Sequence, residues 1–154
     1  MKWTIQKLTK LQNIDNEFEG TVDLSSYIDN TDIIKISPVK INGSFEIYDD
    51  DLYEFFFNIK CTLTLACAIT LVEVPYEIDI SVEEIFTSDK NDEYNNIDGI
   101  TIDLLPIIWS NILLEKPMRV LSKDARLNQE EEISDLEVEE DINQAFANLK
   151  NYNK

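Results

Sequence analysis

The sequence predicts an α+β domain: an antiparallel β-meander of three or more long strands, packed by one apolar helix. Three observations predict it: apolar and polar residues alternate between Val39 and Phe86, aspartates interrupt that alternation, and an apolar segment runs from Leu104 to Leu114. A period of two is typical of strands with one buried and one solvated face. The broad apolar stripe of the later segment indicates a helix that lies against such a sheet.

The alternation defines three strands. From Tyr53 to Cys67 every odd position is apolar, and the even positions include Glu54, Asn58 and Lys60. The preceding strand has its apolar positions at Val39, Ile41, Phe45 and Ile47, and the third has them at Val74, Tyr76, Ile78, Ile80 and Val82. Asp49, Asp50 and Asp51 predict the first turn, and Ala68–Glu73 the second connection.

Shorter elements precede the meander. Trp3 and Ile5 lie on one side of a short opening strand, while Leu8 and Leu11 are spaced equally well for a helical turn, so both alternatives stay open. Asp23 is a typical capping residue, and the segment 23–30 therefore predicts one or two helical turns. Ile33, Ile34 and Ile36 lead into the first meander strand.

The segment after the meander is polar from Thr87 to Asp98 and predicts an exposed loop. Asp103 is placed to cap a helix over Leu104–Leu114, with Pro106 in its first turn and Pro117 just past its end. The nine residues MRVLSKDAR that follow predict an irregular or extended segment.

At 154 residues the chain predicts one domain, residues 1–126, followed by a C-terminal segment, residues 127–154. This segment carries many acids without Lys or Arg between Leu127 and Leu149, which is typical of a flexible linker. Near the end of the C-terminal segment, apolar residues return at helical spacing and predict a short terminal helix. These residues are Ile142, Ala145, Phe146 and Leu149.

The charge is the strongest compositional signal. The chain has 31 acidic and 13 basic residues, no histidine and a net charge of −18. Such a surface repels phosphate, and a basic protein is the better electrostatic match. Two alternatives remain: the charge supplies solubility to a purely structural module, or a local patch binds RNA directly. The candidates for that patch are Lys35, Lys40, Lys60 and Trp109.

The residue inventory argues against catalysis. Without histidine the chain lacks the commonest general base and metal ligand, and the three glycines form no phosphate-binding loop. Cys61 and Cys67 lie roughly 20 Å apart along one strand face, too far to bridge, and are expected to be small buried hydrophobes. We expect no enzyme activity, no cofactor and no metal. The opening MKWTIQKLTK has no apolar signal region, which predicts a cytoplasmic protein.

Five segments carry a resemblance to a known family: MKWTIQKLTK, ISPVKINGSF, CAITLVEVPYEI, IDLLPIIWSNILLEKPMRVLS and INQAFANLK. They resemble the bacterial YceD family of large ribosomal RNA subunit accumulation proteins, in its Gram-positive form. The most specific is CAITLVEVPYEI, which is similar to the family signature Cys-x-Arg-Thr-Leu or Cys-x-Arg-Cys-Leu followed by a Pro-containing strand. Ile69 replaces the signature arginine, and Asn143, Gln144 and Ala145 replace a terminal Asp-Pro-Arg, so the chain resembles a diverged member.

The resemblance implies a non-enzymatic role in ribosome assembly that supports accumulation of large-subunit ribosomal RNA. Together with the charge, it points to a basic ribosomal protein or assembly factor as the partner. Within the matched segments we single out four candidate binding residues: Cys67, Leu71, Arg119 and Phe146. The sequence leaves the oligomeric state undetermined.

Overall fold

The computed structural model describes residues 1–49, 51–89 and 93–128. The chain divides into two compact units, and each is described here by itself. The first comprises Met1–Leu65 and Pro75–Met118, and the described part of the second comprises residues 66–74 and 119–128. No described helix is long and apolar enough to cross a membrane.

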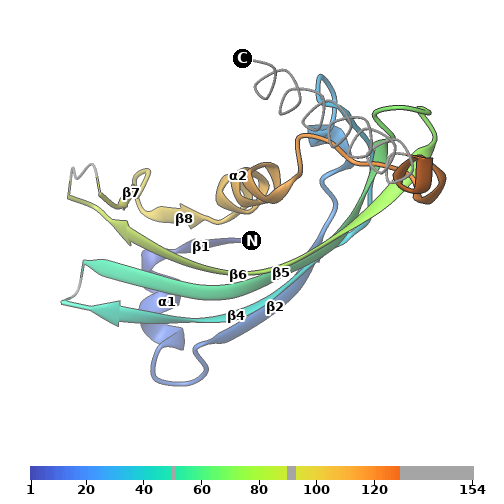
Figure 1. Ribbon diagram of the computed structural model, residues 1–154. Coiled ribbons are helices and arrows are strands. Elements are labelled where there is room, and N and C mark those ends of the chain that lie inside the picture. The colour runs from blue at the N-terminus through green and yellow to red at the C-terminus, as the bar shows by residue number, and fades with distance from the viewer. Residues whose placement is uncertain (50, 90–92, 129–154) are drawn as a thin grey trace, which may run out of the picture. The chain divides into compact units, whose positions relative to one another are not determined.

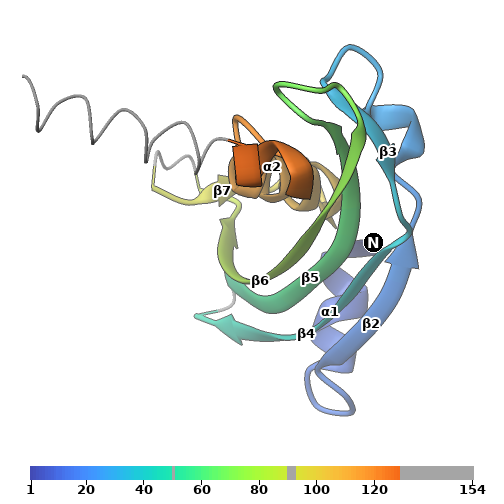
Figure 2. The ribbon, with the colours of Figure 1, turned by 45° about the vertical axis from the view of Figure 1, so that its right-hand side comes forward.

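The predicted meander is confirmed. Strand β4 (Val39–Tyr48) pairs antiparallel with β5 (Leu52–Ala66), and β6 (Glu73–Thr87) is the next strand of the same sheet. Figures 1 and 2 show these long, curved strands side by side. The odd residues of β5 are buried, as their alternation predicts, from Tyr53 to Leu65. The turn between β4 and β5 places Asp49 at φ 50, a backbone conformation that Asp tolerates better than most residues.

Two further strands extend the sheet. Strand β2 (Glu17–Val22) pairs antiparallel with β4 along its whole length, and β3 (Ile33–Ile36) pairs with β5 beyond the end of β4. Strand β2 was not predicted from the sequence, although Phe18, Gly20 and Val22 alternate there with polar residues. The residues Ile33, Ile34 and Ile36, which were expected only to lead into the first meander strand, belong to the separate strand β3.

The N-terminal segment contains both of the alternatives considered for it. Strand β1 (Lys2–Thr4) pairs antiparallel with β8 (Thr101–Asp103), and helix α1 (Ile5–Leu11) follows at once. The Thr4 hydroxyl caps α1 by accepting a hydrogen bond from the Lys7 amide. The expected helical turns at 23–30 reduce to one 3₁₀ turn, η1 (Ser25–Tyr27), where the Asp23 carboxylate accepts a hydrogen bond from the Ser25 amide.

Helix α2 (Leu105–Glu115) covers the concave face of the sheet, as Figure 1 shows. The capping residue is Leu104 rather than Asp103, but the Asp103 carboxylate still accepts a hydrogen bond from the Leu105 amide at 3.0 Å. The apolar stripe is narrower than expected, because Leu113 and Leu114 are exposed. The buried contacts of α2 come from Ile108 and Ile112.

An aromatic cluster fills the space within the concave face. Phe55 is fully buried, and its ring lies within 6 Å, centroid to centroid, of the rings of Trp3, Phe18, Phe45 and Phe86. These rings come from β1, β2, β4 and β6, so one β5 side chain joins four strands. The cluster shows that the concave face of the sheet is the buried one, so the opposite face is exposed to solvent.

Two expectations about connecting segments hold in part. Most described residues of the segment 87–98 are exposed or half-buried, but Thr87 is buried and donates a hydrogen bond to Asp51 at 3.1 Å, and β7 (Asn95–Asn96) pairs parallel with the end of β6. Residues 118–122 are irregular, as expected, whereas residues 123–128 are helical. The predicted terminal helix around Phe146 lies outside the described residues.

Candidate functional site

The second unit is built around residues 66–74, here called the Cys67 loop, which comprise the connection between β5 and β6 and the strand residues that flank it. The Cys67 amide donates to the Val72 carbonyl at 2.8 Å, and the Leu71 amide donates to the Cys67 carbonyl at 3.0 Å. The Ala68 amide donates to the Val120 carbonyl at 2.9 Å. The loop and the segment 119–128 therefore fold as one body through backbone hydrogen bonds.

The Cys67 sulfur is an acceptor at the centre of this body. It accepts hydrogen bonds from the amides of Thr70 at 3.4 Å and Ser122 at 3.2 Å. Burial by itself raises the pKa of the Cys67 thiol, but hydrogen bonds from the Thr70 side chain and from the Thr70, Ser122 and Ile69 amides outweigh it and lower the pKa to about 6. Cys67 is thus buried, as predicted, and its sulfur also accepts hydrogen bonds that join the loop to the segment around Ser122.

The tip of the loop exposes apolar side chains. Leu71 is 75% exposed, and Ile69 and Val72 are each about half exposed. Leu71 also has φ 61, a left-handed conformation that costs a leucine roughly 1–2 kcal/mol. A strained backbone that displays a large apolar side chain to solvent is typical of a binding site rather than of a packing site.

The second unit brings together three of the four candidate residues. Cys67 organises the loop, Leu71 is its exposed tip, and Arg119 is exposed in the segment whose next residue, Val120, bonds to the loop. Phe146 lies outside the described residues. Ile69, which replaces the signature arginine, is exposed beside Leu71 in the sequence, so an apolar side chain stands where the family pattern has a charge.

A second candidate surface belongs to the first unit. It is the face of the β2–β4–β5–β6 sheet that points away from the aromatic cluster, here called the outer face. The alternation of β5 places its even residues there, and the exposed residues of the neighbouring strands continue the surface. Its charged residues are Glu17, Glu19, Lys40, Glu46, Glu54, Lys60, Glu77, Asp79 and Glu83.

Like charges oppose one another on the outer face. Glu46 is directly opposite Glu54 in the β4–β5 register. A hydrogen bond with Glu83, together with the charges of Glu83 and Glu46, raises the pKa of Glu54. The Tyr48 hydroxyl donates to Glu46, which raises the pKa of Tyr48 to about 12. Like charges in cross-strand positions destabilise a sheet, so the ionised forms of Glu46 and Glu54 oppose the pairing of β4 with β5.

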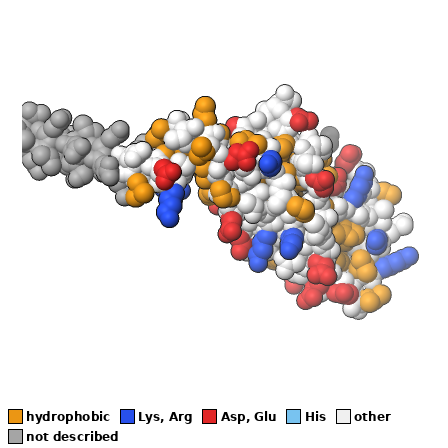
Figure 3. Space-filling view, turned by 90° about the vertical axis from the view of Figure 1, so that its right-hand side faces the viewer, with side chains coloured by type: hydrophobic (Ala, Val, Ile, Leu, Met, Phe, Trp, Pro, Cys, Tyr) orange, Lys and Arg blue, Asp and Glu red, His pale blue; other side chains and the backbone are white. Residues whose placement is uncertain are grey.

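The lysines considered for RNA binding are only partly brought together. Lys40 is directly opposite Lys60, but Lys60 Nζ lies 4.0 Å from the Asp79 carboxylate. Trp109 belongs to α2 on the other face, where its ring packs on Tyr27 at a centroid distance of 5.6 Å. In Figure 3, basic side chains are interspersed with acidic ones on the visible face.

No group of three or more His, Cys, Asp or Glu side chains suited to a metal ion occurs among the described residues. Asp51, one of the turn aspartates, instead accepts hydrogen bonds from Thr87 and Ser88. These hydrogen bonds, led by the one from Ser88, lower the pKa of Asp51. The outer-face carboxylates were not predicted as binding residues, although the same alternation that predicted the strands places them on one face.

Comparisons with known proteins found one family model and a similar bacterial protein. The model of the family described as large ribosomal RNA subunit accumulation protein YceD matches residues 56–152. Uncharacterized protein YlbN of Bacillus subtilis (strain 168) is 39% identical over 126 residues, which cover 78% of this chain and 73% of the relative. No solved structure matches the chain significantly.

Proposed function

Because this chain belongs to the YceD family of large ribosomal RNA subunit accumulation proteins, we propose that it acts in ribosome assembly as a non-enzymatic factor that binds a basic ribosomal protein or assembly factor. The family match is the observation that carries the proposal. It covers the Cys67 loop, most of β5 and all of β6. The segment CAITLVEVPYEI falls within the matched residues.

Charge and surface chemistry support a protein partner. The net charge of −18 repels nucleic acid, and carboxylates predominate on the outer face. The exposed apolar tip formed by Ile69, Leu71 and Val72 adds a surface that a protein covers better than an RNA backbone does. Each surface, taken by itself, suits a basic ribosomal protein or assembly factor better than it suits RNA.

Direct RNA binding is the second candidate function, and the opposition of Lys40 and Lys60 is the observation in its favour. Two neighbouring lysines release few counterions, and so they support only weak, salt-sensitive binding. Two further observations count against RNA binding: Asp79 lies beside Lys60, and Trp109 packs on Tyr27 on the other face of the sheet.

Affinity capture from a lysate of the native organism separates the two. We expect the tagged chain to recover an identified basic ribosomal protein or assembly factor in a complex that dissociates as salt is raised, because the attraction is screened. Recovery of RNA without protein at physiological salt would contradict the proposal. Depletion of the chain should reduce the large-subunit peak in sedimentation, and an unchanged peak would count against a role in assembly.

A further inference from the structure

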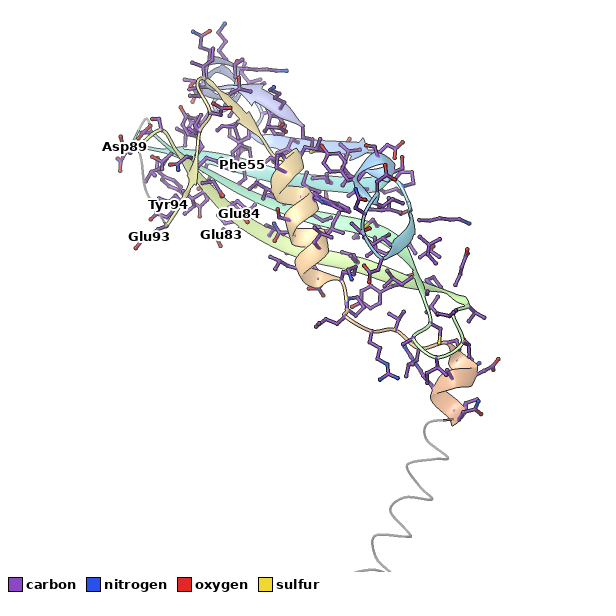
Figure 4. All side chains as sticks on the ribbon, turned by 90° about the horizontal axis from the view of Figure 1, so that it is seen from above. Phe55, Glu83, Glu84, Asp89, Glu93 and Tyr94 are labelled. Atoms are coloured by element: carbon purple, nitrogen blue, oxygen red, sulfur yellow. The ribbon has the colours of Figure 1, made fainter. Side chains whose placement is uncertain are left out.

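One long edge of the sheet is unpaired within the part of the chain that the structure describes. Strand β6 pairs with β5 on one side, and on the other side it meets β7 only at Phe86 and Thr87. The free run from Glu77 to Glu83 spans about 20 Å. In Figure 4, Glu83 and Glu84 lie on this strand, with Glu84 on the side of α2.

The backbone groups on the free edge belong to the odd residues of β6. The carbonyls of Ile85 and Thr87 accept hydrogen bonds from Asn95 and Ile97 on the β7 side, whereas the carbonyl of Ile80 accepts one from Asn58 of β5. Because successive residues of a strand direct their N–H and C=O groups to opposite edges, the groups of Glu77, Asp79, Ser81 and Glu83 face outward from the sheet. Pro75 has the same parity, and an edge is where a strand tolerates proline.

The side chains along this edge have two distinct chemistries. On the outer face Glu77, Asp79 and Glu83 are exposed, and Glu83 stands beside Glu54. On the concave face the apolar side chains of β6 are covered unevenly: Ile78 is buried, but Tyr76, Ile80 and Val82 are only half-buried. The corresponding β5 side chains, such as Phe55, Phe57 and Ile59, are at most 4% exposed.

We propose that the free edge of β6 binds an extended segment of the basic partner as an added strand, with Lys or Arg side chains alternating with apolar ones. This inference rests on the proposed function and adds where and how the partner is held. Backbone hydrogen bonds to the odd residues supply affinity, as in other cases of strand addition. Lys or Arg of the added strand faces Glu77, Asp79 and Glu83, while its apolar residues cover Ile80 and Val82.

The charges also exclude the commonest competing occupant, a second copy of this chain. Two β6 edges paired with each other bring Glu77, Asp79 and Glu83 of one copy against the same carboxylates of the other, which is unfavourable for cross-strand neighbours. Charged side chains are a general means by which an edge strand avoids self-association. The other edge strand, β2, is only six residues long and contains Gly20 at an inward position.

A peptide experiment tests the geometry directly. The probe is a synthetic 12-residue peptide of alternating lysine and valine, and the control has the same composition in the repeat Lys-Lys-Val-Val, which mixes both residue types on each face. Residue-resolved hydrogen exchange is measured on the full chain. We expect the alternating peptide to slow exchange of the Glu77, Asp79, Ser81 and Glu83 amides by about tenfold or more, and the control peptide to leave them fast. Equal effects of both peptides, or no slowing at these amides, would overturn the proposal.

Charge reversal with the natural partner gives an independent test. The double variant Glu77→Lys with Glu83→Lys should lose most of the captured partner. The matched control Asp29→Lys with Glu115→Lys makes the same charge change at exposed residues outside the sheet and should retain the partner. Equal losses in both variants would show a general charge effect and defeat the β6 assignment. Capture by the wild type with equal retention by both variants would reject the β6 edge but leave the proposed function standing, whereas failure of the wild type to capture any basic partner would reject the function itself.

Discussion

At the scale of single residues, Leu71 combines exposure with backbone strain. It contributes little buried area, and its left-handed conformation opposes folding. We expect Leu71→Gly to leave the free energy of unfolding unchanged or to raise it by up to about 1 kcal/mol, because glycine adopts this conformation at low cost but loses more chain entropy. Chemical denaturation measures this difference.

The control for Leu71→Gly is Leu71→Ala, which removes the same apolar contact with a partner but keeps the strained conformation. Both variants should weaken partner capture. A loss of stability in Leu71→Gly comparable to that of a buried leucine would show that Leu71 is a packing residue and contradict its assignment to the binding surface.

Cys67 predicts a pH dependence of stability. Its pKa of about 6 in the folded chain is below the ordinary thiol value, so the thiolate stabilises the fold at high pH and this contribution is lost as the pH falls through about 6. The difference in Tm between the wild type and Cys67→Ala should therefore narrow from pH 9 to pH 5. Ultraviolet absorbance of the thiolate should titrate near pH 6 in a Cys61→Ala background, which removes the second thiol. A constant difference in Tm across this range would contradict the hydrogen-bonded thiolate.

At the scale of secondary-structure elements, Gly43 allows β4 and β5 to approach closely. A Cβ atom there meets the Phe56 carbonyl oxygen at 2.1 Å and the Phe57 Cα at 2.6 Å, both of them backbone atoms that cannot rotate away. We expect Gly43→Ala to lower the free energy of unfolding by roughly 1–3 kcal/mol or more, as overpacking does. Gly20→Ala on β2 is the control, because its Cβ meets only the flexible end of Met1. Denaturant titration of both variants should separate them, and equal losses would contradict the close approach.

The outer-face carboxylates predict a stabilising substitution. The folded-state pKa of Glu54 is raised, chiefly by its hydrogen bond with Glu83, so the ionised form opposes folding once the pH exceeds the ordinary value. Glu54→Gln should therefore raise Tm at pH 7, and its advantage should shrink as the pH falls and Glu54 becomes protonated. A thermal melt series from pH 3 to pH 7 tests this. A lower Tm of Glu54→Gln at neutral pH would indicate a favourable ionised contact instead.

At the scale of the whole molecule, the net charge of −18 sets the response to salt. Self-repulsion among carboxylates opposes the compact state, and salt screens it over a Debye length of about 10 Å at 0.1 M. We expect Tm to rise with NaCl while the affinity for the basic partner falls. Sodium chloride melts paired with binding titrations at the same concentrations test both trends, and a parallel fall of Tm and affinity would contradict the role assigned to like-charge repulsion.

Local sequence patterns predicted the buried residues of β5 and the position of α2, but they missed β2 and overestimated the apolar stripe of α2. The odd–even alternation of β5 predicted which residues are buried, and the flanking prolines and Asp103 located α2 to within one residue. Strand β2 was missed because it is six residues long and its inward positions include a glycine, so its pattern alone is weak. The width of the apolar stripe of α2 was overestimated, because Leu113 and Leu114 are exposed and do not lie on the side that Ile108 and Ile112 bury.

The sequence by itself determined the sidedness of each long strand, the acidic surface and the lack of histidine chemistry, because side-chain period and composition are local properties of the chain. Only the tertiary structure decided that the Cys67 sulfur accepts a hydrogen bond from Ser122 and that β2 pairs with β4. It also decided that most of the free edge of β6 lacks a partner strand among the described residues. Each of these depends on which distant segments meet. Strand pairing and hydrogen-bond partners are set by packing across the whole fold, and no local period encodes them.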